Sequence, residues 1–186
     1  MEETGCKSQV FSTQEFREAL GLFATGIAVV TAVTEGRDRI GATVSSFNSV
    51  SLDPPLVLFS MARSSRAFPA WQSVAHFAVN VLAEHQHATS TKFARALSDK
   101  WEGTRYVEGE NGAPLLPDSL ASFECARYAN YDGGDHVILV GRVLTVRVRR
   151  RADAVPLIFF CSKYRRLAGE SAIQAPSDVD RLFYGW

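Results

Sequence analysis

The sequence lacks an excess of charge of either sign. Twenty Lys and Arg residues balance twenty Asp and Glu residues, so the formal net charge at pH 7 is +0. Proteins that bind duplex nucleic acid usually carry a basic excess on one face or stripe. The local basic runs at residues 147–151 and 163–166 are short, and they are typical of solvated strand ends or loops. We therefore expect no nucleic-acid partner.

Cysteines are few, and long apolar runs are absent. Cys6, Cys125 and Cys161 are odd in number and widely spaced, unlike a disulfide framework or the paired ligands of a structural zinc site. Residues 1–9 are polar and lack the apolar core of a signal peptide. No run approaches the roughly 18–20 apolar residues of a membrane span. These features predict reduced thiols, no membrane partner and a cytoplasmic location.

Several catalytic signatures are also missing. Residues 21–26 have the glycine spacing of a phosphate loop but lack the Lys and the Ser or Thr that should follow. No Gly-x-Gly-x-x-Gly fingerprint and no Gly-x-Ser-x-Gly elbow occur, which disfavours a Rossmann nucleotide site and a serine hydrolase. His85 and His87 could face one side of a strand, but no carboxylate or cysteine set lies nearby. We predict a solvated segment there and no metal site.

What the sequence does have is a succession of β-like segments. Apolar or alternating runs predict strands at residues 27–33, 40–44, 56–61, 76–82, 120–128, 136–148 and 155–160. Helices are predicted at residues 13–22, 66–73 and 89–97, the first after the capping-box pair Ser12 and Glu15. Residues 98–119 are rich in Gly, Pro, Asp and Asn and predict a long loop. Strands do not alternate with long helices, so we predict a mainly β fold, a β-barrel with peripheral helices.

The length of 186 residues fits a single domain. We place its core at about residues 12–168 and a C-terminal tail at residues 169–186. The tail ends in the aromatic segment 182–186, which is expected to pack on the body or to contact a partner subunit.

A serine-rich segment lies between two predicted strands. Residues 43–51 contain one Thr and four Ser, and Asp53-Pro54-Pro55 follows. Hydroxyls donate and accept hydrogen bonds without adding charge, which suits a ligand with phosphate or polyol oxygens. An ordinary turn explains the same composition.

A second candidate is the segment Gly133-Gly134-Asp135-His136, at the start of the strand predicted over residues 136–148. Two glycines let the backbone adopt conformations closed to other residues. A histidine at a strand mouth can hydrogen-bond a ligand or carry charge near neutral pH. A plain hairpin turn is the alternative.

Taken in order along the chain, these segments resemble the flavin reductase family, whose fold is the flavin-binding split β-barrel. The resemblance covers residues 16 to about 167, most of the chain. The matching motifs are Phe16-Arg17, Gly21-x-Phe-x-Thr-Gly26-Ile-x-Val-Val-Thr31, Gly41-x-Thr-Val-x-Ser46-Phe-x-Ser-Val-Ser-Leu-x-Pro-Pro-Leu56, Phe77-x-Val-Asn-Val-Leu82, Phe93-Ala94, Gly133-Gly-Asp-His136, Gly141-x-Val143, Pro156-Leu157 and Tyr164.

The resemblance implies a set of flavin contacts and a nicotinamide side. The implied flavin contacts are Thr25, Gly26, Ile27, Thr43, Val44, Ser45, Ser46, Ser49, Val50, Ser51, Ser60, Met61, Ala62, Ser65, Arg66, Lys92 and Phe93. Ser65 and Arg66 correspond to phosphate contacts. His136 and the segment from Phe160 to Tyr164 correspond to the nicotinamide side. Many relatives carry Asn in place of Ser45, so the shorter serine implies a flavin contact that is lost or made through water.

The implied activity is hydride transfer from NADH or NADPH to FMN or FAD. In such a reaction the cofactor carries out the chemistry, and the protein positions the two reacting rings. His136 is then a nicotinamide-positioning residue, because the hydride step needs no general base. Family members typically form homodimers and pass reduced flavin to a separate monooxygenase. Two alternatives stay open: an electron carrier that keeps its flavin bound, and a flavin-binding module without redox turnover.

Overall fold

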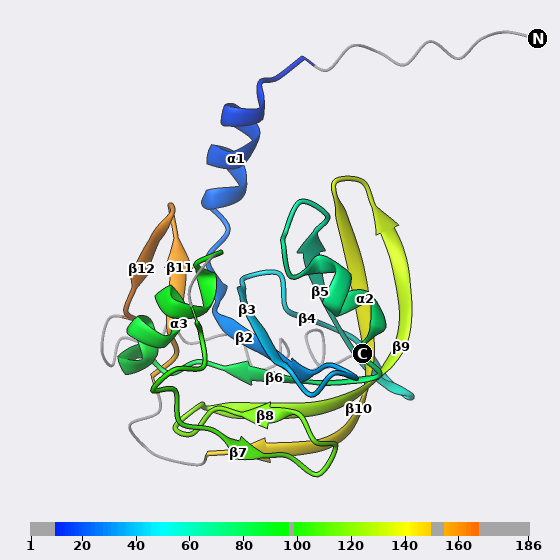
Figure 1. Ribbon diagram of the computed structural model, residues 1–186. Helices are drawn as coiled ribbons and strands as arrows, with labels where there is room; N and C mark the ends of the chain where they lie inside the picture. Colours follow the sequence, from blue (N-terminus) through cyan, green and yellow to red (C-terminus); the bar gives the residue numbers. More distant parts are fainter. Residues whose placement is uncertain (1–9, 97–98, 150–154, 168–186) are drawn as a thin grey trace, which may run out of the picture.

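The computed structural model describes residues 10–96, 99–149 and 155–167 (Figure 1), so the predicted tail at residues 169–186 lies outside the described residues. Its main feature is an antiparallel sheet of seven strands in the order β3-β2-β6-β9-β10-β5-β4. The strands are β2 (Ala28–Val33), β3 (Arg39–Val44), β4 (Asn48–Leu52), β5 (Pro55–Ala62), β6 (His76–Val81), β9 (Ala121–Gly133) and β10 (His136–Val148). The prediction of a mainly β fold is confirmed.

The sheet curls into a barrel that does not close. Its two edge strands, β3 and β4, are consecutive in the sequence and are joined by residues 45–47 alone, yet no ladder pairs them. Ser46 bridges the gap from this connection, because its Oγ accepts a hydrogen bond from Ser60 N of β5 at 2.9 Å. The barrel is therefore split beside the serine-rich segment.

Smaller elements surround the barrel (Figure 1). One three-stranded sheet has the order β1-β11-β12, formed by β1 (Thr25–Gly26), β11 (Ile158–Phe160) and β12 (Lys163–Arg165), and a second pairs β7 (Val107–Glu108) with β8 (Pro114–Leu115). The helices are α1 (Thr13–Gly21), α2 (Phe68–Ser73), the 3-10 turn η1 (Glu84–Gln86) and α3 (His87–Ala94). In the described parts of the chain, no helix is long and apolar enough to cross a membrane.

The two larger hydrophobic clusters of the core lie inside the barrel and outside it, and we call them the inner and the outer cluster. Inside the barrel, Phe59 packs edge-on against Trp71 of α2 and against Phe77 of β6, with ring centroids 5.5 and 5.4 Å apart. Outside it, Phe93 fastens α3 to a second cluster that includes Leu82. These contacts anchor α2 and α3 to the barrel.

The structure differs from the predicted elements where pairing overrides local composition. Residues 48–52, read as part of a loop, form β4, because pairing with β5 compensates for the low strand propensity of Ser and Asn. Strand β9 runs to Gly133 rather than 128, since its polar end still pairs with β10. His85 and His87 lie on η1 and at the start of α3 rather than on a strand, and both are exposed, which agrees with the predicted solvated segment.

Strand β10 begins and ends as predicted, at residues 136 and 148, but its side-chain alternation is interrupted. Register shifts fall between Val140 and Gly141 and between Val143 and Thr145. The first shift inserts Tyr128 as an extra residue in β9, and the second inserts Leu144 as an extra residue in β10. Leu144, Val146 and Val148 are exposed.

Candidate functional site

A groove of about 500 Å³ lies among β3, β5, α3 and the start of β10. It brings together residues that the sequence places far apart, including the serine-rich segment and the Gly-Gly-Asp-His turn. Its lining residues are Ala42, Thr43, Val44, Ser45, Ser46, Ser60, Met61, Ala62, Ser64, Ser65, Arg66, Ala67, Phe93, Ala94, Ala96, Lys100 and His136.

The groove is cationic. Among the described residues that line it, Arg66 and Lys100 are basic and none is Asp or Glu. A guanidinium and an ammonium with no neighbouring carboxylate suit an anionic group such as a phosphate. Val44, Met61 and Phe93 add apolar surface. This combination fits a ligand with a flat, largely apolar ring and an anionic tail, which describes FMN and FAD.

Two backbone carbonyls hold the side chain of Lys100 in place. Its Nζ donates hydrogen bonds to Gly41 O at 3.0 Å and to Phe93 O at 2.9 Å. An ammonium has three donors, so one N–H is left for a ligand. Burial lowers the pKa of Lys100 from its ordinary value.

The ammonium of Lys100 lies where β3 and α3 approach each other closely. A Cβ on Gly41 would lie 2.5 Å from Cε1 of Phe93, so the absence of a side chain lets that ring rest against β3. The two carbonyls that Lys100 contacts therefore converge on one point. Trp101, which follows Lys100, packs edge-on against Phe93 with ring centroids 5.1 Å apart.

Two hydroxyls of the serine-rich segment are used to hold the scaffold together. Thr43 Oγ1 donates to Ser90 O at 2.6 Å, which ties β3 to α3. Ser46 Oγ accepts from Ser60 N at 2.9 Å and thereby bridges the split. The segment thus lines the groove and also fixes its width, and the reading of an ordinary turn does not account for these contacts.

His136 enters the groove from the first position of β10. It pairs with Ala62 of β5 and with Gly133 of β9, which fixes its backbone on both sides. Its Nδ1 lies 2.7 Å from Asp135 Oδ1, and this hydrogen bond is the largest cause of the lowered pKa of Asp135. Gly134 has a φ of +74°, which glycine adopts without strain. The segment is therefore a hairpin turn that also delivers a histidine to the groove.

Some residues implied by the family resemblance do not line this groove. Ser49, Val50 and Ser51 lie on β4, the edge strand beyond β5. Lys92 Nζ donates to Glu102 O and, at 2.9 Å, to Thr104 Oγ1, outside the groove lining.

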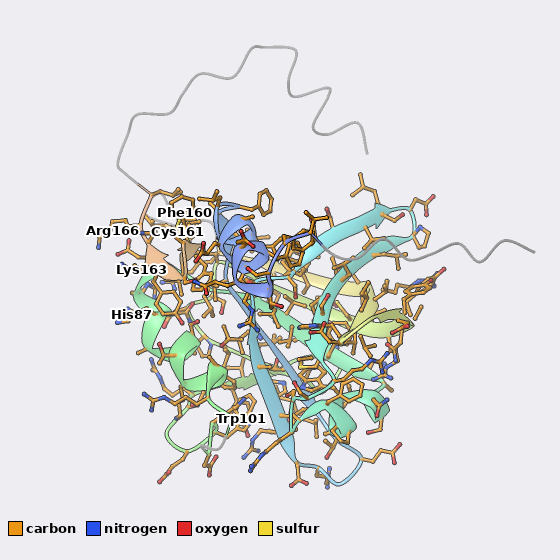
Figure 2. The ribbon with its side chains drawn as sticks, turned by 90° about the horizontal axis from the view of Figure 1, so that it is seen from above. His87, Trp101, Phe160, Cys161, Lys163 and Arg166 are labelled. Atoms are coloured by element: carbon orange, nitrogen blue, oxygen red, sulfur yellow. The ribbon has the colours of Figure 1, made fainter. Side chains whose placement is uncertain are left out.

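The other residues that the resemblance implies, but that do not line the groove, lie in the three-stranded sheet β1-β11-β12 or, for Ile27, directly beside it. Thr25 and Gly26 form β1, which pairs with β11, and Ile27 is buried in the outer cluster. Phe160 is the last residue of β11, in the hairpin that joins β11 to β12. In this hairpin Cys161 N donates a hydrogen bond to Gly21 O at 2.8 Å. Figure 2 shows Phe160, Cys161 and Lys163 close together in the hairpin.

Tyr164 connects this hairpin to the groove. Its hydroxyl lies 2.8 Å from Ser90 Oγ, and Ser90 O accepts the hydrogen bond from Thr43. The β11–β12 hairpin is therefore linked through Ser90 to Thr43, which lines the groove. The roles assigned to Phe160 and Tyr164 on the nicotinamide side stay predictions.

The sequence reasoning missed six lining residues, of which Lys100 is the one with charge. The others are Ala42, Ser64, Ala67, Ala94 and Ala96. Small residues carry no pattern that separates a groove wall from a helix or loop. Lys100 lies in the segment predicted as a loop, where only its contacts with Gly41 and Phe93 in space reveal its place.

Comparisons with known proteins agree with this geometry. Residues 20–168 match the model of the family described as flavin reductase like domain. The chain is 46% identical over 162 residues to FMN reductase (NADH) SmoA of Agrobacterium fabrum, covering 84% of this chain and 87% of that protein. It is 41% identical over 137 residues to stachydrine N-demethylase reductase subunit Stc3 of Rhizobium meliloti, covering 74% of this chain and 60% of that protein.

Among solved structures, the chain is similar to the NADH:FAD oxidoreductase SgcE6 of Streptomyces globisporus in complex with NAD and FAD fragments. The TM-score is 0.79 at 32% identity, and the match covers 89% of this chain and 100% of that one. The predicted split barrel and the predicted family are both confirmed. The chain belongs to the flavin reductase family defined by this domain.

Proposed function

We propose that this chain is an NADH-dependent reductase of FMN or FAD that supplies reduced flavin to a partner flavin-dependent monooxygenase. The observation that carries the proposal is the groove, in which Arg66, Lys100 and His136 lie together beside the split of the barrel. The similar proteins support it, since they include an FMN reductase (NADH) and a reductase subunit of a flavin-dependent monooxygenase.

The residues of the groove divide into a flavin-holding set and a nicotinamide-positioning one. Arg66 and the free N–H of Lys100 hold the anionic part of the flavin. Val44, Met61 and Phe93 provide the apolar surface for its ring. When bound, the flavin supplies the ring that accepts the hydride. His136 orients the nicotinamide, because hydride transfer depends on alignment of the two rings.

An anaerobic mixing experiment tests this function. The protein is combined with FMN and then with NADH, and the visible absorbance of the flavin is followed. We expect it to bleach in proportion to the NADH added. Binding of FMN without bleaching would contradict the proposal and support a flavin-binding module without redox turnover. Repeating the measurement with NADPH and with FAD defines which pair reacts faster.

Replacement of His136 by alanine is expected to raise the KM for NADH about threefold to tenfold, because about one hydrogen bond to the nicotinamide is lost. The Kd for FMN, measured by fluorescence quenching, should change less than twofold. His76→Ala is a matched control, since His76 is exposed at the start of β6 and does not line the groove. A larger loss in flavin affinity than in nicotinamide KM would contradict the assignment.

Helix α1 supports a proposal of homodimerisation. The helix is capped by Ser12 and Glu15, yet none of its residues is buried, and it projects away from the barrel in Figure 1. Phe16 and Leu20, at helical spacing on one face, are 49% and 57% exposed. A helix of this length is marginal in water without tertiary packing of its apolar face. We propose that a second copy of the chain covers it.

The mass in solution tests this proposal. Light scattering should give the mass of two chains for the native protein and of one chain for Leu20→Lys, which places a charge on the apolar face. Gln14→Lys is the control, because it adds the same charge four residues before Glu18, where a favourable pair forms. A single-chain mass for the native protein with full activity would refute the dimer.

A further inference from the structure

Arg63 makes several contacts with one short turn. It follows the last residue of β5, and its backbone N donates to Asp135 O at 2.9 Å. Its side chain donates from Nε to Gly134 O at 2.9 Å and from Nη2 to Asp132 Oδ1 at 2.7 Å. The same Oδ1 accepts a hydrogen bond from Gly134 N at 3.2 Å. Arg63 thus holds the turn between β9 and β10.

This turn needs an external clamp. Gly133 and Gly134 are adjacent, and glycine loses more conformational freedom on ordering than any other residue. The loop that joins the two strands is Gly134-Asp135. A guanidinium presents its donors in a rigid plane, so two acceptors of the turn are fixed relative to each other. The hydrogen bond from Arg63 is the largest cause of the lowered pKa of Asp132.

The turn held by Arg63 contains Asp135, which contacts His136 of the groove. Asp135 is the second residue of the loop, and its Oδ1 lies 2.7 Å from Nδ1 of His136. The other ring nitrogen is then the one available to a ligand, and the direction in which it points depends on where the carboxylate sits. Arg63 itself is absent from the groove lining. Arg63 can therefore affect the site only indirectly, through the turn and the contact of Asp135 with His136.

We propose that Arg63 is a positioning residue for the nicotinamide: by clamping the Asp132–Asp135 turn, it holds Asp135 where that carboxylate orients the imidazole of His136. The inference rests on the proposed function, because it assigns the nicotinamide to the His136 side of the groove. Arg63 should matter for the binding of NADH and not for the binding of flavin.

The Arg63 side chain is expected to contribute little to the stability of the barrel. Exposed ion pairs contribute little to stability, and the side chains of Arg63 and Asp132 are 45% and 80% exposed. The backbone of His136 is also fixed by its pairing with Ala62 and Gly133, independently of the Arg63 side chain. Loss of the side chain should therefore loosen the turn without unfolding the barrel.

The test compares Arg63→Met with the native chain in three measurements. We expect the KM for NADH to rise about fivefold, with kcat and the Kd for FMN within twofold of the native values. Backbone amides of residues 133–136 should exchange with solvent at least fivefold faster. Arg63→Lys should recover part of the KM effect, because an ammonium can replace one of the two side-chain contacts but not both. Arg142→Met is the control, since Arg142 is exposed near the middle of β10 and does not line the groove.

Two results would overturn the inference. One is an unchanged KM in Arg63→Met, whether or not exchange in the turn accelerates. The other is a parallel loss of kcat, flavin affinity and melting temperature, which identifies a general structural role. Absence of NADH oxidation by the native chain would contradict the proposed function and this inference together, whereas normal native turnover with an unchanged KM in the variant contradicts the inference alone.

Discussion

Replacing Lys100 by methionine is expected to weaken the binding of FMN by about tenfold to a hundredfold. Hydrogen bonds to charged groups contribute about 1.5–3 kcal/mol, and about 1.4 kcal/mol corresponds to a factor of ten in Kd. Methionine keeps most of the volume of the side chain but removes the cation that Gly41 O and Phe93 O hold at the groove. The Kd is measured by quenching of flavin fluorescence. The loss should be smaller for riboflavin, because riboflavin has no phosphate.

Lys92→Met is the informative comparison for Lys100→Met. The family resemblance implies a flavin contact for Lys92, but its ammonium points to Glu102 O and Thr104 Oγ1 instead. The geometry predicts less than a twofold change in the Kd for FMN. If Lys92→Met weakened FMN binding as strongly as Lys100→Met, the assignment of Lys100 as the groove cation would be wrong.

Replacing Arg147 by methionine is expected to lower the free energy of unfolding by about 2–3 kcal/mol. Glu124 has a fully buried side chain, and Arg147 Nε donates to its Oε1 at 3.1 Å. Removing one partner of a fully buried pair costs about 3–5 kcal/mol, because the remaining charge loses its counter-ion. In Arg147→Met the Glu124 carboxylate keeps a hydrogen bond from Asn111 N to its Oε2 at 3.0 Å, which reduces this cost. Half of the Arg147 side chain is exposed, so solvent screening reduces the expected loss. Urea unfolding measures it.

Arg149→Met serves as the matched control for Arg147→Met. Arg149 pairs with Asp118 at 2.6 Å, but both partners keep substantial exposure. Pairs of this kind contribute about 0–1 kcal/mol. An equal loss in the two variants would show that burial of Glu124 has no special importance. The NADH oxidation rate of folded Arg147→Met should match that of the native chain, because neither member of the pair lines the groove.

Much of the fold could be predicted because its signals are local. Ser12 and Glu15 cap α1 as their spacing indicates, and Ser12 Oγ accepts from Glu15 N at 3.1 Å. The apolar run before Thr34 forms β2, and both ends of β10 were placed correctly. Strand β4 escaped prediction because its pairing with β5 lies outside its own composition. The bulges at Tyr128 of β9 and Leu144 of β10 depend on the pairing of these two strands, which neither segment encodes alone.

The groove could be predicted in part, through motifs whose order matched a known family. That order led to Arg66, His136 and residues 43–46 of the serine-rich segment, which the structure brings to one groove. It could not reveal Lys100, whose position depends on the contact of Gly41 with Phe93 across β3 and α3. Nor could it show that the hydroxyls of Thr43 and Ser46 are already engaged by the scaffold. Those facts depend on tertiary contacts.

The central claim is that the chain turns over added flavin at the expense of NADH. Its most direct test is the number of NADH molecules oxidised per protein molecule when FMN is supplied in large excess under air. The account predicts many turnovers at a rate that saturates with FMN concentration. A rate of NADH oxidation that does not change with the concentration of added FMN would contradict it and identify an electron carrier that keeps its flavin bound.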